Sequence, residues 1–205
     1  MPQTTAQKPT VTDAISTLYA NIRFAERENP IRSIAITSAT AGEGKSFIAL
    51  QLAKAMAQSG KKTLLVDANC HAPVLAGQLG VTAARGIAEI VASEADLSEA
   101  VSGTKTTDLA FLNGGSGLAA PADLFGTDAF AEMVKGVSAA YDYMIFDTPA
   151  LDPYIDAAVL ASVVDATVLV VRQHAVSRDA VAAACDQLGK AHAHVIGVAL
   201  NDCED

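Results

Sequence analysis

The sequence predicts an α/β fold of the doubly wound kind, in which a mainly parallel sheet carries helices on both faces. Three observations support this fold class. Short apolar runs alternate along the chain with longer segments of helical periodicity. The runs are almost continuously apolar, which is typical of strands that are covered on both sides. A glycine-rich loop directly follows the first run and leads into a helix, as expected within a parallel sheet with helical crossovers.

The predicted elements follow one another from residue 11 onward. A first helix is expected over 11–25, and Pro30 ends that region. We then expect strand 33–37, helix 45–58, strands 62–66 and 109–112, helix candidates over 122–137, strand 143–146, helix 154–164, strand 166–171, helix 178–190 and strand 194–200. Residues 1–10 are polar and proline-containing, so a flexible lead-in is expected there. Residues 11–205 are expected to form one domain.

The composition restricts the class of function. The 205 residues carry a net charge of −9, which argues against a nucleic-acid partner or a polybasic membrane contact. An apolar fraction of 51% excludes intrinsic disorder. The longest apolar stretch, 157–171, is interrupted by polar residues, so no membrane span is expected. The three cysteines are scattered, which favours a reducing cytoplasm.

The strongest motif is Ala39-Thr-Ala-Gly-Glu-Gly-Lys-Ser46, placed between a predicted strand and a predicted helix. This is the context of a P-loop, in which backbone N–H groups and a helix N-terminus surround a polyphosphate. Lys45 would reach the outer phosphates, and the Ser46 hydroxyl would ligate Mg²⁺. The predicted nucleotide-binding residues of the loop are Ala41, Gly42, Glu43, Gly44, Lys45, Ser46 and Phe47. Ala39 replaces the glycine that usually begins this motif, and a residue as small as alanine should fit there. For the motif as a whole, the alternative interpretation is an incidental glycine turn between a strand and a helix.

Two aspartates, Asp67 and Asp147, each follow an apolar strand. Ligands of open α/β sheets lie at the carboxyl ends of the strands, so both carboxylates are expected near the P-loop. Asp147 would hold Mg²⁺, and Asp67 would ligate the same ion or accept a proton from the attacking nucleophile. The predicted catalytic residues are therefore Lys45, Asp67 and Asp147, and the predicted metal ligands are Ser46, Asp67 and Asp147. For both aspartates the alternative is an N-cap on the following turn.

Together these motifs resemble the bacterial tyrosine kinases of the CpsD/CapB type, within the P-loop superfamily that includes MinD and ParA. Further matching segments are Lys62-Thr-Leu-Leu-Val-Asp-Ala68, Ala120-Pro-Ala-Asp-Leu-Phe-Gly126, Tyr141-Asp-Tyr-Met-Ile-Phe-Asp-Thr-Pro149 and Val195-Ile-Gly-Val-Ala-Leu-Asn201. The resemblance implies ATP and Mg²⁺ as cofactors, with the P-loop as Walker A. Asp67 would begin the Walker A′ motif, and Asp147 would end Walker B. It also implies that Asn201 contacts the adenine base, for which a simple turn residue is the alternative.

The resemblance further implies an ATPase or kinase in exopolysaccharide or capsule synthesis or export. Such a chain would be cytoplasmic and recruited to the inner face of the membrane. Its partner would be a membrane-embedded polysaccharide co-polymerase supplied in trans, and self-association is compatible with the family. The ParA/MinD type of positioning ATPase is an alternative, although those proteins carry a second lysine where this chain has Thr40.

The chain departs from the family pattern in three places. Asn69 replaces the second acid of the Walker A′ motif, and His71 and Ala72 follow where basic residues are usual. The E-x-x-R-x-x-R positions of the first helix hold Asp13, Ser16 and Tyr19. The four tyrosines, Tyr19, Tyr141, Tyr143 and Tyr154, lie outside any C-terminal tail. These departures favour, as an alternative, a catalytically weak protein that senses nucleotide and regulates a partner.

Overall fold

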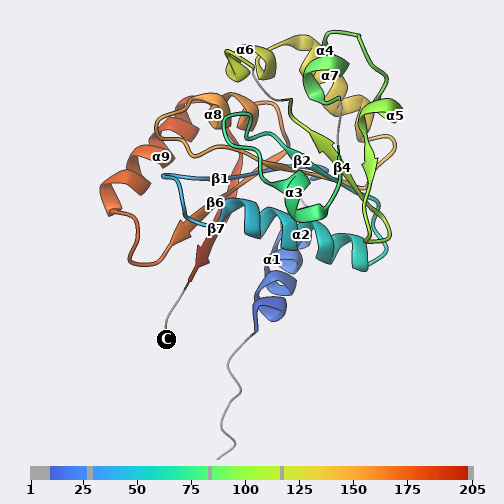
Figure 1. Cartoon of the computed structure of the whole chain (residues 1–205). Helices are drawn as coiled ribbons and strands as arrows, with labels where there is room; N and C mark the ends of the chain where they lie inside the picture. Colours follow the sequence, from blue (N-terminus) through green and yellow to red (C-terminus); the bar gives the residue numbers. More distant parts are fainter. Residues whose placement is uncertain (1–9, 27–29, 83–84, 116–117, 203–205) are drawn as a thin grey trace, which may run out of the picture.

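A seven-stranded sheet forms the centre of the computed structural model, which describes residues 10–26, 30–82, 85–115 and 118–202 (Figure 1). Within these ranges the strand order is β3-β4-β2-β5-β1-β6-β7. The strands are β1 (Ser33–Ser38), β2 (Thr63–Asp67), β3 (Ser102–Gly103), β4 (Leu109–Asn113), β5 (Tyr143–Asp147), β6 (Ala166–Arg172) and β7 (Val195–Asn201). All pairs are parallel except that of the two-residue edge strand β3 with β4. The predicted mainly parallel sheet is therefore confirmed.

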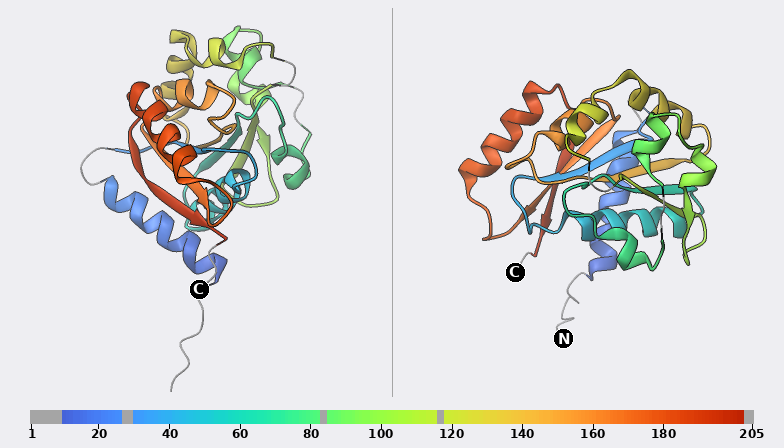
Figure 2. Two further views of the ribbon diagram at one scale, coloured as in Figure 1. Left: turned by 90° about the vertical axis from the view of Figure 1, so that its left-hand side faces the viewer. Right: turned by 45° about the horizontal axis from the view of Figure 1, so that its top comes forward.

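Helices cover both faces of the sheet, as the two views of Figure 2 also show. One face carries α1 (Val11–Ala25), α2 (Lys45–Gln58) and α3 (Leu75–Leu79). The other carries α4 (Ile87–Val91), α5 (Leu97–Ala100), α6 (Pro121–Phe125), α7 (Asp128–Val137), α8 (Asp156–Ala161) and α9 (Arg178–Lys190). This arrangement confirms the doubly wound fold class.

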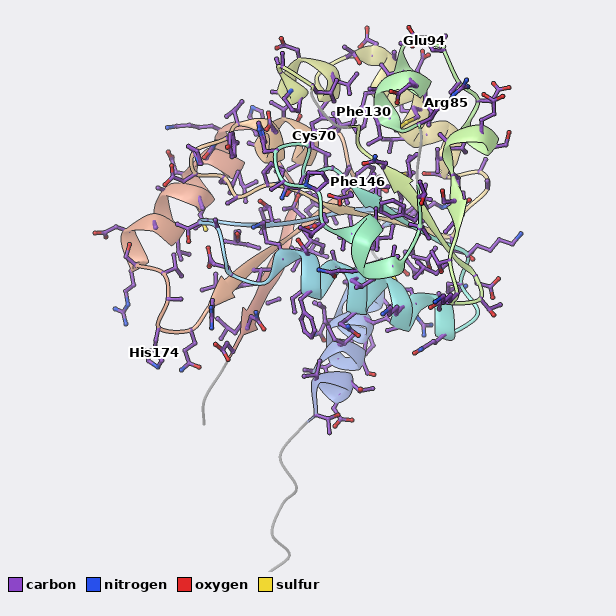
Figure 3. The ribbon with its side chains drawn as sticks, viewed as in Figure 1. Cys70, Arg85, Glu94, Phe130, Phe146 and His174 are labelled. Atoms are coloured by element: carbon purple, nitrogen blue, oxygen red, sulfur yellow. The ribbon has the colours of Figure 1, made fainter. Side chains whose placement is uncertain are left out.

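Successive residues of the central strands enter different cores, which explains why the strands are continuously apolar. In β1, Ile34 and Ile36 pack with α1 and α2, whereas Ala35 between them packs with the helices of the opposite face. On that opposite face, the ring of Phe130 in α7 lies 6.2 Å from that of Phe146 in β5 (Figure 3). Phe125 of α6 lies 5.2 Å from Phe130. Each of these three rings is fully buried, so they anchor α6 and α7 on the sheet.

The structure corrects several expected boundaries. The helix candidates over 122–137 form two helices, α6 and α7, because the Thr127 side chain caps the second by accepting from Phe130 N at 3.1 Å. The helix expected over 154–164 is shorter and comprises only α8. The short elements α3, α4, α5 and β3 were not predicted. Of the expected flexible lead-in, residues 1–9 lie outside the described residues, and Thr10 caps α1.

Strand β7 differs from the expectation that the strands are buried on both faces. Its side chains Val198 and Leu200 are 54% and 64% exposed. The reason is its position, because β7 is the edge of the sheet next to β6. Among the described helices, none is long and apolar enough to cross a bilayer.

Candidate functional site

The predicted motifs meet at the carboxyl ends of three adjacent strands. The P-loop connects β1 to α2, Asp67 ends β2, and Asp147 ends β5. Asp67 and Asp147 are direct register partners on β2 and β5, and Ile36 of β1 pairs with Asp147 from the other side. The sheet therefore brings both carboxylates to the base of the P-loop, at the edge where open α/β sheets bind ligands.

The P-loop depends on glycine at two positions. Gly42 and Gly44 have φ angles of +84° and +95°, which side-chain-bearing residues rarely adopt. A Cβ atom on Gly44 would also lie 2.1 Å from Nδ2 of Asn201. By contrast, Ala39 at the first position is buried and packs in a cluster with Leu151, so alanine fits where the motif usually has glycine.

Glu43 fixes the shape of the loop through its side chain. Its carboxylate is 1% exposed and accepts hydrogen bonds from Thr40 N at 2.6 Å and from Arg172 N at 3.1 Å. Its main-chain oxygen accepts a hydrogen bond from Asn201 Nδ2 at 2.9 Å. The Glu43 side chain therefore ties the loop to β6, and the predicted contact of Glu43 with nucleotide would have to come from its backbone. Asn201, expected at the adenine base, lies against the same loop.

Lys45 begins α2 and its side chain is buried. Burial lowers the pKa of its ammonium group, and the nearby carboxylates of Asp147 and Glu43 act in the opposite direction. The neighbouring Ser46 is half-buried, whereas Ala41 and Phe47 are exposed. The lysine therefore lies close to Asp147, and the outer part of the loop faces solvent.

Asp147 is fully buried, and neither of its carboxylate oxygens has a hydrogen-bond partner of normal geometry. Burial raises its pKa to about 7; nearby Asp67 also raises it, while the Ser46 hydroxyl and the Lys45 charge lie close enough to lower it. An unpaired buried carboxylate costs free energy unless a cation or a proton compensates it. Such an arrangement is expected where a metal ion completes the site.

The two carboxylate oxygens of Asp67 have different surroundings. Its Oδ2 accepts hydrogen bonds from Val74 N and Leu75 N, each at 2.9 Å, and so caps the start of α3. Its Oδ1 is buried without a partner. Burial raises the pKa of this carboxyl group against the lowering effect of the backbone hydrogen bonds. One oxygen is thus structural, and the other remains available beside Asp147.

The predicted ligands are typical of a Mg²⁺ site that a nucleotide helps to complete, and not of a metal site formed entirely by protein side chains. Mg²⁺ is usually bound by one or two carboxylates, with substrate phosphates and water completing its shell. Ser46, Asp67 and Asp147 would supply a hydroxyl oxygen and two carboxylates, with three unpartnered carboxylate oxygens between them. In the described part of the chain, no three His, Cys, Asp or Glu side chains gather as a metal cluster. The nucleotide itself would have to complete the coordination.

A cluster that the sequence did not reveal lies beside this site. His71 Nε2 lies 2.5 Å from Asp156 Oδ2 at the start of α8. The His71 ring is also stacked on the ring of Tyr154, with centroids 3.6 Å apart. Asn69, two residues earlier, closes a turn through Ala72. The sequence marked His71 as unusual for its motif, but its partners lie about 80 positions away in the chain.

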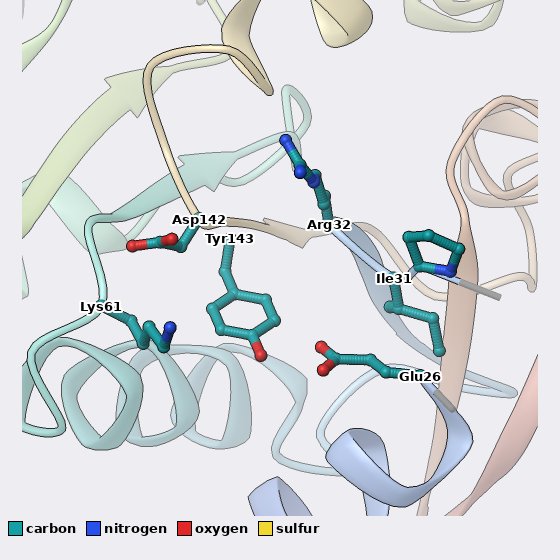
Figure 4. Close-up of a pocket in the computed structure, with 7 residues that line it drawn as sticks. Glu26, Ile31, Arg32, Lys61, Asp142 and Tyr143 are labelled. Atoms are coloured by element: carbon teal, nitrogen blue, oxygen red, sulfur yellow. The ribbon is translucent and has the colours of Figure 1, made fainter. Parts of the chain in front are cut away.

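A separate pocket of about 270 Å³ lies at the opposite edge of the sheet (Figure 4). Glu26, Arg32, Lys61, Asp142 and Tyr143 contribute to its lining. Arg32 directly precedes β1, Lys61 lies just before β2, and Asp142 directly precedes β5, so the pocket is at the amino ends of the strands. It contains none of the predicted nucleotide-binding, catalytic or metal-ligating residues and is not the candidate nucleotide site.

Several proteins are similar to this chain in sequence, and two of them illustrate the relationship. "Tyrosine-protein kinase CpsD" of Streptococcus agalactiae is 34% identical over 185 residues, which cover 90% of this chain and 80% of CpsD. "Succinoglycan biosynthesis transport protein ExoP" of Rhizobium meliloti is 34% identical over 143 residues, covering 68% of this chain but 18% of ExoP. The similarity to ExoP thus concerns one part of a much longer protein.

Solved structures agree with this relationship. The chimerical protein CapA2B2 matches with a TM-score of 0.89 and 28% identity, covering 98% of this chain and 88% of the other. The septum site-determining protein MinD of Pyrococcus horikoshii, solved with Mg-ADP, matches with a TM-score of 0.70 and 24% identity, covering 83% and 70%. The second likeness concerns the P-loop fold alone. The AAA domain family matches residues 31–195. The chain therefore belongs to the P-loop family of bacterial tyrosine-protein kinases related to CpsD.

Proposed function

We propose that this chain binds ATP with Mg²⁺ in its P-loop and catalyses transfer of the γ-phosphoryl group. The observation that carries the proposal is Asp147, a fully buried carboxylate with both oxygens unpartnered next to the P-loop lysine. A cation bound there would compensate the negative charge of Asp147, and a polyphosphate would compensate the positive charge of Lys45. We further propose that residues 11–205 act as one nucleotide-binding unit.

The residues of the chain divide the chemistry among them. The P-loop N–H groups would hold the phosphates, and Lys45 would offset the negative charge that spreads over the γ-phosphoryl oxygens in the transition state. Ser46, Asp67 and Asp147 would hold Mg²⁺, which when bound neutralises phosphate charge. As the alternative to holding the ion, the free Oδ1 of Asp67 would accept the proton of the attacking hydroxyl. Catalysis by this site would rest on positioning and charge compensation.

The proposed process is exopolysaccharide or capsule synthesis or export, with a membrane polysaccharide co-polymerase as partner. The relationship to CpsD and to ExoP, whose name concerns succinoglycan biosynthesis and transport, supports this assignment. The chain would then act in the cytoplasm at the inner face of the membrane, recruited by that partner. Because the proposed partner is a separate protein, measuring nucleotide binding by the isolated chain tests the proposed ATP site independently of the proposed partner.

The decisive experiment replaces Lys45. Lys45→Met should reduce ATP turnover by about 10²–10³-fold, the loss expected when one preorganised charge-stabilising group is removed. The matched control is Lys54→Met, which makes the same change on the same helix, at a half-buried position outside the site. Calorimetry with Mg-ATP measures binding in parallel. Equal turnover by wild type and Lys45→Met would contradict the proposal.

A nucleotide-sensing regulator with little turnover is the second candidate, and Asn69 favours it. The Asn69 side chain bonds to the backbone of Ala72 and supplies no carboxylate to the site. If this candidate holds, calorimetry will register Mg-ATP binding without measurable ATP consumption. Replacing Asn69 with Asp would then be expected to raise turnover, whereas steady turnover by the wild type would exclude the regulator.

A further inference from the structure

The four tyrosines of the chain, all within its described part, occupy two opposite edges of the sheet. Tyr19 places its hydroxyl 3.2 Å from that of Ser59, at the end of α2. Tyr143 is 5% exposed at the start of β5, and Tyr141 is half-buried just before that strand. All three lie at the amino edge. Tyr154, which is 38% exposed, lies between β5 and α8 and is the one tyrosine at the carboxyl edge, where the P-loop lies.

Backbone hydrogen bonds join the segment that carries Tyr154 to the end of β1 and to the first residue of the P-loop. Leu151 N donates to Ser38 O at 2.9 Å, and Asp152 N donates to Ala39 O at 3.1 Å. Ala39 and Tyr154 also line one cavity of about 450 Å³, together with residues of α9. Tyr154 is therefore close to the first residue of the phosphate loop, with open space beside it.

His71, in the Walker A′ segment, contacts the Tyr154 ring. The His71 ring is stacked on it with an interplanar angle of 12°, and Asp156, which is 4% exposed, holds the His71 ring through Nε2. A buried carboxylate thus orients the histidine, and the histidine orients the phenol. Restricting an acceptor group in this way removes much of the entropic barrier to its reaction.

We propose that Tyr154 is the tyrosine of this chain that accepts a phosphoryl group from ATP, with His71 as the residue that positions it; this rests on the function proposed above. The phenolic oxygen forms a new bond to the γ-phosphorus, and the bond between that phosphorus and the β–γ bridging oxygen breaks. ADP leaves, and the phenolic proton is released to water. The products are ADP, one proton and phosphotyrosine in the segment between β5 and α8.

The test incubates the full chain with Mg-ATP and maps phosphotyrosine by tandem mass spectrometry. Modification is expected at Tyr154, and Tyr154→Phe should abolish the phosphotyrosine signal while still binding Mg-ATP in calorimetry, which checks folding. The matched control, Tyr141→Phe, should keep the wild-type level. His71→Ala should slow modification by about 10- to 100-fold through lost positioning, and His71→Phe, which retains a ring to stack, should recover part of the rate.

The outcomes separate this inference from the function on which it rests. Phosphotyrosine at another position, or ATP turnover without any phosphotyrosine, would overturn the assignment of Tyr154 and leave the P-loop function standing. An unchanged modification rate in His71→Ala would overturn the positioning role. Failure of the chain to bind Mg-ATP would overturn both proposals.

Discussion

Replacing Gly44 with alanine should damage the P-loop in two separable ways. The first is backbone strain, because Gly44 has a φ of +95°; a non-glycine residue held there costs about 1–2 kcal/mol. The second is a steric clash, because the new Cβ would lie 2.1 Å from Nδ2 of Asn201. Asn201 would have to move and give up its hydrogen bond to Glu43 O, which is worth about 0.5–1.5 kcal/mol.

The free energy of unfolding should therefore fall by about 1.5–3.5 kcal/mol in Gly44→Ala, as the sum of strain and a lost hydrogen bond. Gly42→Ala is the matched control, since Gly42 has a φ of +84° but a Cβ added there would meet nothing within 4 Å. It should lose only the strain contribution of about 1–2 kcal/mol. Urea unfolding followed by circular dichroism measures both variants, and calorimetry measures the accompanying loss of Mg-ATP affinity.

A double variant isolates the clash. Removing the amide with Asn201→Ala should make the added Gly44→Ala change less costly by about 0.5–1 kcal/mol, because the effects of substitutions at contacting residues are not additive. If Gly44→Ala and Gly42→Ala cost the same, or if Asn201→Ala brings no relief, Asn201 does not brace the loop and the reasoning is wrong.

Two further predictions concern buried side chains, Asp147 at the end of β5 and Phe130 of α7. Because burial holds the pKa of folded Asp147 near 7 while the unfolded carboxyl ionises near 3.8, the nucleotide-free protein should lose stability as pH rises between these values. Asp147→Asn should flatten that part of the pH profile in urea titrations, and an equally steep profile would contradict the raised pKa. Phe130→Ala should lower the free energy of unfolding by about 3–5 kcal/mol, since a cavity replaces a buried ring. Val198→Ala, at a half-exposed edge position, should cost less than about 1 kcal/mol in the same assay.

The sequence predicted the long elements and the position of the P-loop because both leave local signals. The central strands are buried on both faces, so their apolar runs are unmistakable. By contrast, α3, α4 and α5 are only four or five residues long, too short for a helical period to register. Strand β7 kept the composition of a buried strand, although its edge position leaves it exposed, and no local pattern distinguishes the two cases.

The candidate site was predictable where a motif defines it and not where it depends on tertiary pairing. Strand-end position alone placed Asp67 and Asp147 together, and the register confirms that they are neighbours. That one oxygen of Asp67 would cap α3 while the other stayed free could not follow from sequence, because both functions use the same residue type. The stack of His71 on Tyr154 joins segments distant in the chain and left no signal.

The ties made by Glu43 and Asn201 have a consequence for how a ligand would be received. The carboxylate of Glu43 joins Thr40 to Arg172 at the end of β6, and Asn201 joins the loop to the end of β7. These hydrogen bonds to two strands restrict the conformations that the P-loop can adopt without a bound polyphosphate. The loop would therefore lose little conformational entropy when it binds a phosphate group. More of the attraction between the loop and the phosphate would then contribute to the binding affinity.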